Sequence, residues 1–212
     1  MRKKESQYAW ADSKRSCSHD YLMPPVIECL SALDLKRAPK KLFDLGCGNG
    51  TVAAALSDMG WQVVGVDASM QGIKWANRSF PHLKLRFGSA YDDLSRRYGK
   101  FPVTLSLEVV EHLYDPKLYA KNLFKLTAPG GTAILSTPYH GYLKNLAISV
   151  LDGWDSHFTA LWPGGHIKFW SVRTLSTLLR EAGFKVESVQ RVGRVPWFAK
   201  SMILVCKRPL GE

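Results

Sequence analysis

The stretch that decides the fold is Lys41-Leu-Phe-Asp-Leu-Gly-Cys-Gly-Asn-Gly50, and the helix-like run Thr51–Leu56 and the apolar segment Val63–Asp67 follow it. An apolar strand, a glycine turn, a helix and a second apolar strand ending in an acid form half of a nucleoside-binding α/β unit. Glycine lets the backbone turn sharply and approach a ligand closely. Asp67, 21 residues after Gly46, is placed to accept hydrogen bonds from a ribose. The stretch therefore predicts a site for a nucleoside-like cofactor.

Two details of the glycine turn argue against a dinucleotide. Gly46, Gly48 and Gly50 follow the pattern G-x-G-x-G rather than G-x-G-x-x-G. Asp44 precedes the turn, where its charge opposes a pyrophosphate at the helix N-terminus but favours a cation. The sulfonium and ammonium groups of S-adenosylmethionine (SAM) suit such a site, and the fragment resembles motif I of the class I SAM-dependent methyltransferases. A structural glycine turn in another Rossmann-like protein is the alternative.

Length and composition fit a single domain, residues 1–212, with a substantial core. The net charge of +11 favours an anionic partner, either nucleic acid or lipid headgroups, or else reflects a solvated basic surface. The amino end lacks the apolar core of a signal peptide, and no apolar run is long enough to cross a bilayer. The four cysteines form no C-x-x-C pair. We therefore expect a cytoplasmic protein with reduced thiols.

Alternating apolar strands and helical segments indicate an α/β fold with a parallel sheet and helices on both faces. We expect a helix over 24–33, begun by Pro24 and Pro25, within an N-terminal helical cap of residues 1–38. The expected strands are 41–45, 62–67, 83–87, 102–107, 132–137, 184–192 and 197–206, and the other expected helices are 50–59, 69–79, 115–127 and 171–182. Ala128–Gly131 is expected to be the stop signal that closes the helix at 115–127.

The segment between Thr137 and Phe169 interrupts this alternation, and we expect residues 139–165 to form an insertion or lid. Projected at ~100° per residue, the run Tyr142–Asp152 is mostly apolar. Its polar residues, Lys144, Asn145, Ser149 and Asp152, fall in one narrow arc, and Trp154, Phe158, Leu161 and Trp162 extend the apolar surface. The segment is predicted either to cover an active site or to enter a membrane interface. A helix packed on the domain body is the alternative.

An acidic cluster with a histidine follows the strand expected at 102–107. Glu108, Glu111 and His112 stand at i, i+3 and i+4, so one helical turn would bring their side chains together. They follow a central strand, at the sheet edge where open α/β proteins bind ligands. Two carboxylates and an imidazole suit Mg²⁺, Mn²⁺ or Zn²⁺, and His166 is the candidate fourth ligand.

Spacing alone leaves two other interpretations of this cluster open. In the first, His112 is a general base near neutral pH and Glu111 orients it. In the second, Glu108 caps the next helix and His112 is an ordinary surface residue.

The chain as a whole resembles the ubiquinone-biosynthesis O-methyltransferases, which methylate catechol oxygens on polyprenyl aromatic rings. The resemblance is carried by E-x-x-E-H at 108–112, by the run Pro129–Thr137, by Gly165-His166 with Lys168-Phe169 and, more weakly, by Trp10, His19 and Pro24. The E-x-x-E-H run with a distant histidine is also similar to the small-RNA 3′-terminal 2′-O-methyltransferases. The turn Ser136–His140 departs from the quinone family, which has an asparagine there, and this leaves the acceptor open.

The resemblance implies a Rossmann-like class I methyltransferase fold: a seven-stranded, mostly parallel sheet in the order 3-2-1-4-5-7-6, with an apolar insertion after the fifth strand. It places SAM at Asp44, Gly46, Gly48, Gly50, Asp67, Ala68, Ser89, Ala90 and Glu108. It places a divalent cation at Glu108, Glu111, His112 and His166, with Glu111, His112 and His166 as the catalytic residues. The aromatic residues Tyr8, Trp10, His19 and Tyr21 are weaker candidates for an acceptor pocket.

The activity that this resemblance implies is SAM-dependent O-methylation of a small aromatic or prenylated, lipid-like quinone-type acceptor, with peripheral membrane contact. One alternative is 2′-O-methylation of an RNA 3′ end, which the positive charge supports but which lacks a separate RNA-binding module in this sequence. Another is a noncatalytic SAM-binding partner at a membrane surface.

Overall fold

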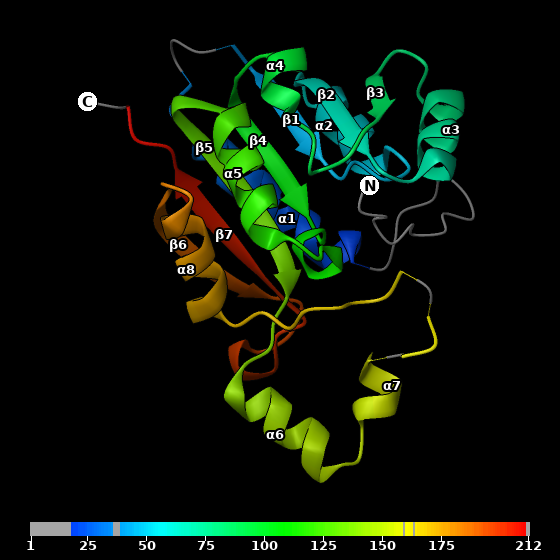
Figure 1. Cartoon of the computed structure of the whole chain (residues 1–212), viewed down its shortest axis with the longest axis vertical. Helices are drawn as coiled ribbons and strands as arrows, with labels where there is room; N and C mark the ends of the chain where they lie inside the picture. Colours follow the sequence, from blue (N-terminus) through cyan, green and yellow to red (C-terminus); the bar gives the residue numbers. More distant parts are fainter. Residues whose placement is uncertain (1–17, 36–38, 159, 163, 211–212) are drawn as a thin grey trace.

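One seven-stranded sheet forms the centre of the computed structural model, which describes residues 18–35, 39–158, 160–162 and 164–210 (Figure 1). Its strands are β1 (Lys41–Leu45), β2 (Gln62–Asp67), β3 (Lys84–Phe87), β4 (Phe101–Leu107), β5 (Thr127–Pro138), β6 (Lys185–Val192) and β7 (Ser201–Lys207). Their order is β3-β2-β1-β4-β5-β7-β6. The strands from β3 to β5 pair in parallel, and β7 runs antiparallel to both of its neighbours. The sheet order and the Rossmann-like class expected from the sequence are confirmed.

Helices cover both faces of the sheet, because successive strand residues point to opposite sides. Phe43 of β1 belongs to one buried cluster and its neighbour Leu42 to the other. The Phe43 side is covered by α4 (Leu94–Tyr98), α5 (Pro116–Leu126) and α8 (Val172–Glu181), and the Leu42 side by α1 (His19–Ser31), α2 (Thr51–Asp58) and α3 (Met70–Ser79). The result is the three-layer arrangement in which ligands bind at the carboxyl ends of the central strands.

Three expected boundaries are wrong. The strand expected at 197–206 begins only at Ser201, because residues 196–198 form a 3₁₀ turn with proline at its start. The first helix begins at His19, so Pro24 and Pro25 lie inside it. Leu22 and Met23 are buried in the core, and this packing favours helix before the prolines. The stretch Ala128–Gly131 is not a loop but belongs to β5, whose register with β4 shifts between Phe101 and Val103. The short α4 and the 3₁₀ turn η2 (Pro196–Phe198) were not expected from the sequence. The rest of the 1–38 cap lies outside the described residues.

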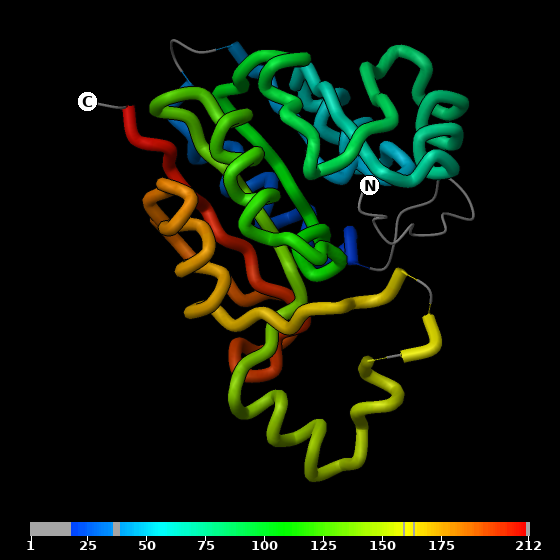
Figure 2. The backbone as a smooth tube through the Cα atoms, viewed as in Figure 1, coloured from blue at the N-terminus to red at the C-terminus, as the bar shows by residue number. Residues whose placement is uncertain are grey.

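The insertion leaves the sheet after β5 and returns before α8. It contains α6 (Tyr142–Val150) and α7 (Trp154–Phe158), which stand apart from the layered core in the backbone trace of Figure 2. Its two ends meet in a parallel bridge between Tyr139 and Trp170. Within the described residues, no helix is both long enough and apolar enough to span a membrane.

Candidate active site

The loop between β1 and α2 has a conformation that its glycines allow. Gly46 has φ +90° and Gly50 has φ +81°, in the left-handed region that favours glycine. A Cβ at Gly46 would collide with Val109, and a Cβ at Gly50 would lie 2.9 Å from that of Ala76. Gly46 and Gly48 line a cavity above the strand ends. Gly50, which was predicted to bind the cofactor, does not line the cavity. Its lack of a side chain instead allows Ala76 to pack closely against the loop.

Asp67, at the end of β2, holds this loop in place. One carboxylate oxygen accepts a hydrogen bond from Gly48 N at 2.8 Å and the other accepts one from Ser69 N at 2.7 Å. Burial raises the pKa of Asp67, while these two hydrogen bonds oppose the rise. Asp67 and Ala68 both line the cavity. The acid expected to meet a ribose therefore lies beside the glycine loop and faces the cavity.

Asp44 is a buried acid, only 2% exposed, at the floor of the same region. Burial, and then the nearby Asp67, raise the pKa of Asp44 to about 7. Among the described residues, its Oδ2 has no hydrogen-bond partner. A buried carboxylate without a partner is costly, and a cation supplied by a ligand would remove that cost. The structure thus provides an environment of the kind predicted for the positive groups of SAM.

The turn after β3 contributes less than the sequence suggested. Gly88 and Ala90 line the cavity. Ser89 is absent from this lining, and its hydroxyl accepts a hydrogen bond from Tyr91 N within the turn. Ala90 is therefore placed to meet a ligand, whereas Ser89 is placed to shape the turn.

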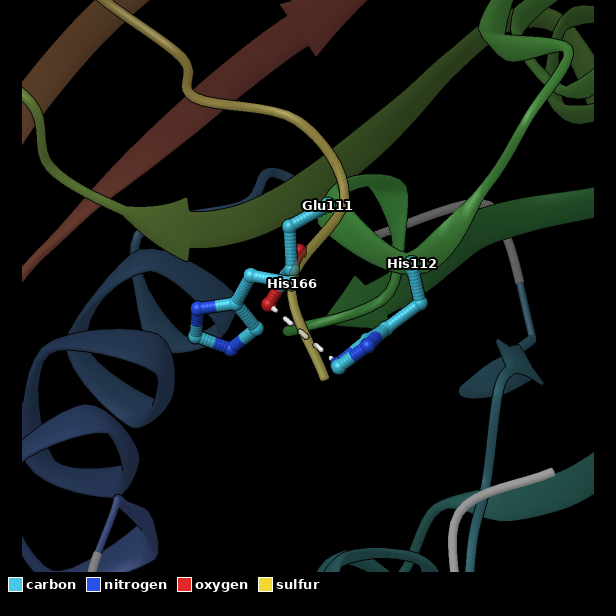
Figure 3. Close-up of side chains that lie close together, drawn as sticks. All are labelled: Glu111, His112 and His166. Atoms are coloured by element: carbon cyan, nitrogen blue, oxygen red, sulfur yellow. Dashed lines mark ion pairs between the residues drawn. The ribbon is translucent and has the colours of Figure 1, made fainter. Parts of the chain in front are cut away.

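Glu111, His112 and His166 form a second site at the end of β4 (Figure 3). Glu111 and His112 lie on the single 3₁₀ turn η1 (Val110–His112), and His166 comes from the returning arm of the insertion. Ile167 N and Lys168 N both donate to the carbonyl of Glu111, at 2.9 and 3.1 Å, which fixes the returning arm to η1. One potential ligand atom from each of the three side chains lies within 4.8 Å of the other two. The structure thus brings together three residues that are 55 positions apart at most in the sequence.

Glu111 is buried, at 1% exposed, and only part of its carboxylate is satisfied. Oε2 accepts a hydrogen bond from Thr137 Oγ1 at 3.0 Å, whereas Oε1 has no partner among the described residues and points toward His112, 3.9 Å from Nε2. Burial, followed by the charge of Glu108, raises the pKa of Glu111 well above its ordinary value. A carboxylate oxygen in this position suits a bound cation.

The pKa values of both histidines are shifted toward the neutral form that metal ligands require. His112 Nδ1 lies 3.2 Å from Gly165 O, and because a carbonyl can only accept, Nδ1 donates and Nε2 keeps a lone pair. Burial lowers the pKa of His112. Burial and then His112 lower the pKa of His166 to about 4. The ring centroids of the two histidines lie 5.0 Å apart, with their nitrogens near Glu111.

Glu108 lies in a neighbouring environment and is not part of the three-residue group. Its backbone has φ +55°, unusual for a residue with a side chain. Its carboxylate accepts hydrogen bonds from Ser136 Oγ at 2.7 Å and Ser201 Oγ at 3.3 Å. Burial raises its pKa to about 7, while the two serines and Lys144 oppose the rise. Glu108, the first acid of E-x-x-E-H, therefore faces Ser136 of β5 and Ser201 of β7 rather than Glu111 and His112.

A single cavity of about 1020 Å³ connects these groups. Its donor half is lined by Asp44, Gly46, Gly48, Asp67, Ala68 and Ala90, and its acceptor half by Glu108, His112, Lys144, His157, Trp162, His166, Arg194, Lys200 and Ser201. Tyr21 and His19 line it from α1, whereas Tyr8 and Trp10 lie outside the described residues. The sequence did not indicate Arg194, Lys200 or Ser201, since no motif marks them. For Lys144, the sequence indicated only a place in the polar arc of the run Tyr142–Asp152.

The fold, with its glycine loop and acidic strand ends, defines a nucleoside-binding α/β protein with a second polar site beside the cofactor crevice. A family model described as a methyltransferase domain matches residues 18–189. The chain belongs to this methyltransferase family.

Proteins named ubiquinone biosynthesis O-methyltransferase are among its relatives. The one from Thiobacillus denitrificans is 31% identical over 163 residues, which cover 72% of this chain and 69% of that protein. The one from Caulobacter sp. strain K31 is 35% identical over 132 residues, 59% of this chain and 51% of that protein. The chain thus spans about half to two thirds of the length of these relatives.

Solved structures confirm the fold. A magnesium protoporphyrin IX methyltransferase from Synechocystis PCC 6803, solved with bound SAH, has a TM-score of 0.65 at 22% identity, over 87% of this chain and 81% of that one. A [4+2]-cyclase has the same TM-score of 0.65 at 16% identity, over 98% of this chain and 88% of that one. Because one fold supports different reactions, the activity must be argued from the site.

Proposed function

We propose that this chain transfers a methyl group from SAM to a hydroxyl of a small aromatic, quinone-type acceptor. The observation that carries the proposal is that one cavity joins the glycine loop and Asp67 to His112 and His166, whose ring nitrogens lie close to the buried carboxylate of Glu111. A donor site beside a site that suits two vicinal oxygens is the arrangement an O-methyltransferase needs. The names of the relatives support the same acceptor class.

Three groups of this chain are suited to hold the donor. Gly46 and Gly48 leave room for a ligand against the backbone, and Asp67 offers carboxylate oxygens to ribose hydroxyls. Asp44, buried and with one unpaired oxygen, suits the positive end of the molecule. When bound, SAM would supply the methyl group as an electrophile.

The acceptor hydroxyl must lose its proton before or during transfer, and we propose that a divalent cation assists. Glu111 Oε1, His112 Nε2 and a ring nitrogen of His166 would hold it, whereas Glu108, also predicted as a ligand, lies outside this group with its oxygens on Ser136 and Ser201. A bound cation would lower the pKa of a coordinated hydroxyl and fix its direction. Glu111 supplies the negative charge, Thr137 orients it, and Gly165 O holds His112 in the tautomer that leaves Nε2 available. The alternative is His112 as the general base.

We further propose that the insertion meets a lipid-like acceptor or a membrane surface. Its large apolar side chains are unusually exposed, with Leu161 97% and Leu151 78% accessible, beside Tyr142 and Val150. The tryptophans are not the most exposed residues of this surface. Trp154 packs near Phe169, with ring centroids 5.9 Å apart, and Trp162 lies edge-on to His112. Val150 and Leu161, which do not line the cavity, therefore replace the tryptophans as the residues to test.

The experiment is an assay of the purified chain with SAM, Mg²⁺ and a catechol, in which mass spectrometry detects the O-methyl product. A small RNA with a free 3′ end is the parallel substrate. Methylation of the catechol and not the RNA is the expected result. Methylation of the RNA alone would identify RNA, and not a catechol, as the acceptor. SAM binding without any transfer would favour a noncatalytic SAM-binding partner.

A further inference from the structure

The turn between β6 and β7, residues 193–200, presents apolar side chains that the proposed chemistry does not use. Its sequence is Gly193-Arg-Val-Pro-Trp-Phe-Ala-Lys200, and η2 forms its centre. Val195 is 63% exposed and Trp197 is 61% exposed, and we call these two side chains the tip of the turn. A tryptophan is seldom left so exposed, because burial of its large ring is strongly favourable. The tip therefore indicates an interaction surface.

The turn is held firmly at its base, so the exposure of its tip is a property of the fold. Lys200 N donates to Val192 O at 2.9 Å, and Lys200 O accepts a hydrogen bond from Tyr139 N at 3.0 Å. Ala199, next to the tip, is fully buried. The backbone is thus tied to β5 and β6, while the side chains of the tip project from it.

A second set of exposed apolar side chains lies beside the turn. Tyr142, Leu146 and Val150 stand at i, i+4 and i+8 of α6, so they share one face of that helix, and all three are exposed. Lys144 and Ile148 instead line the cavity. α6 and η2 are neighbours in the fold, and both lie at the lower end of the molecule in Figure 1. Two separate elements therefore present apolar side chains at one end of the protein.

Exposed basic side chains flank the tip. Arg194 and Lys200 stand at the two ends of the turn, and Arg191 lies near the end of β6. All three are exposed, and among the described residues no carboxylate lies within salt-bridge distance of any of them. The chain as a whole has a net charge of +11. An apolar tip between uncompensated positive charges suits a surface that is anionic outside and apolar inside.

We propose that the turn between β6 and β7 inserts its tip into an anionic lipid bilayer. Val195 and Trp197 enter the boundary between headgroups and acyl chains, where tryptophan is favoured. Arg194 and Lys200 meet the lipid phosphates, because the negative surface potential attracts each positive side chain. This inference goes beyond the proposed methyl transfer, and it concerns a different element from the insertion.

A second copy of the chain fits this end of the molecule less well than a bilayer does. Contact between two copies through the tip would bring the exposed Arg191, Arg194 and Lys200 of both chains together, and like charges oppose such a contact. An anionic bilayer offers opposite charge beside an apolar interior. The charges around the tip therefore favour lipid as its partner.

The position of the tip also relates the bilayer to the cavity. Phe198 follows Trp197 in η2, is 41% exposed and lines the cavity. The tip itself does not line the cavity. Insertion of the tip would thus bring this side of the cavity to the lipid surface without using any group that lines it.

The test is flotation of the full chain with vesicles of phosphatidylcholine alone and of phosphatidylcholine mixed with phosphatidylglycerol. The wild type is expected to float with the anionic vesicles, and raised salt should reduce the bound fraction. Replacing both Val195 and Trp197 by serine should lower the partition coefficient about tenfold, since the tip can then bury little apolar surface. Phe87→Ser is the matched control, because Phe87 is an exposed aromatic residue that follows an arginine but lies on β3, at the opposite edge of the sheet. It should float as the wild type does.

Tryptophan fluorescence gives a second readout, which reports where the ring of Trp197 lies. Vesicles with brominated acyl chains should quench part of the emission of the wild type. Trp197→Phe should remove that part while it changes flotation by less than about threefold, because phenylalanine keeps most of the apolar surface. Quenching that is the same in wild type and Trp197→Phe would overturn the proposed insertion.

The remaining outcomes separate this inference from the proposed methyl transfer. A wild type that does not float, or that floats no better than the Val195 and Trp197 double variant, would overturn the inference even if catechol methylation is normal. A dimer that forms with rising concentration and is lost in the double variant would assign the tip to a second copy and contradict the proposal. Flotation that depends on the tip, in a protein without methylation, would support the inference and contradict the proposed reaction.

Discussion

The donor and acceptor halves of the cavity are built in different ways. Most of the donor half comes from one continuous stretch, in which β1, the glycine loop and Asp67 at the end of β2 follow each other within 27 residues, 41–67, and Ala90 joins it from the turn after β3. The acceptor half gathers His112 from η1, Lys144 and His166 from the two arms of the insertion, and Arg194 from the turn after β6. A contiguous site is fixed by local backbone geometry, whereas a gathered site depends on how distant segments pack. The two halves should therefore respond separately to mutation.

Removal of the cation is expected to give the largest difference between the effect on turnover and the effect on SAM affinity. Chelation, or Glu111→Gln, should reduce turnover by at least about 100-fold, because the acceptor hydroxyl then loses its activating charge. SAM affinity, measured by calorimetry, should stay within about twofold, since the donor half is untouched. Excess Mg²⁺ should partly rescue His166→Ala. A chelated protein that keeps its full rate, alongside an inactive His112→Ala, would assign catalysis to His112 as a general base.

The converse experiment breaks the donor half. Asp67→Ala should weaken SAM binding by about 1–3 kcal/mol, because ribose hydroxyls and the amides of Gly48 and Ser69 lose their acceptor. Asp58→Ala, which removes an exposed acid at the far end of α2, is the control. Calorimetry with each variant measures the effect. Unchanged affinity in Asp67→Ala would reject the assignment of this residue to the donor.

The pH dependence of donor binding is a smaller effect with a definite sign. The pKa of Asp44 is raised by burial to about 7, so the carboxylate becomes ionised as pH rises through that value. SAM affinity should then increase about tenfold between pH 6 and pH 8 by proton linkage. Asp44→Asn should abolish that slope. A wild-type affinity that is flat over this range would contradict a role for Asp44 in binding the cation.

The same group affects the stability of the unliganded chain in the opposite direction. Because its folded pKa lies above its ordinary value of 3.8, Asp44 stabilises the fold most at low pH. That contribution is lost as pH rises from about 4 toward 7. Urea unfolding of wild type and Asp44→Asn should therefore diverge across this window. Parallel curves would show that burial of this charge has no net cost.

The smallest effect is expected at the exposed end of the insertion. Replacing both Val150 and Leu161 by serine should reduce partition to anionic vesicles about 5- to 10-fold, since less apolar surface can be buried. Methylation of a water-soluble acceptor should change by less than about twofold, because neither residue lines the cavity. Flotation measures the first quantity. Trp154→Phe is the control, and equal flotation of all three proteins would make the insertion purely structural.

The comparison of the two halves also explains what the sequence could predict. The glycine loop and Asp67 were predictable, since they depend on neighbouring residues, and the alternation of strands and helices was predictable from periodic segments, whereas the sheet order was predicted from the family resemblance. The placing of His166 beside Glu111 and His112 was predicted from a resemblance and agrees with the packing. Arg194 and Lys200 were not predictable, because they become neighbours of Lys144 only after β6 and β7 have joined the sheet. The start of α1 was predicted wrongly from Pro24, because tertiary packing outweighed the preference of proline for the first turn of a helix.

The closure of the insertion at its base has a consequence for how this protein can change. Tyr139 and Trp170 lie side by side, and the carbonyl of Glu111 receives both Ile167 N and Lys168 N. The chain between these fixed points can thus be lengthened, shortened or exchanged while His166 keeps its position. The proposed acceptor preference and membrane contact would then be encoded in a replaceable segment, and the proposed chemistry in the frame that carries it. Exchange of residues 141–161 between related chains is accordingly a route to new acceptors that leaves the reaction unaltered.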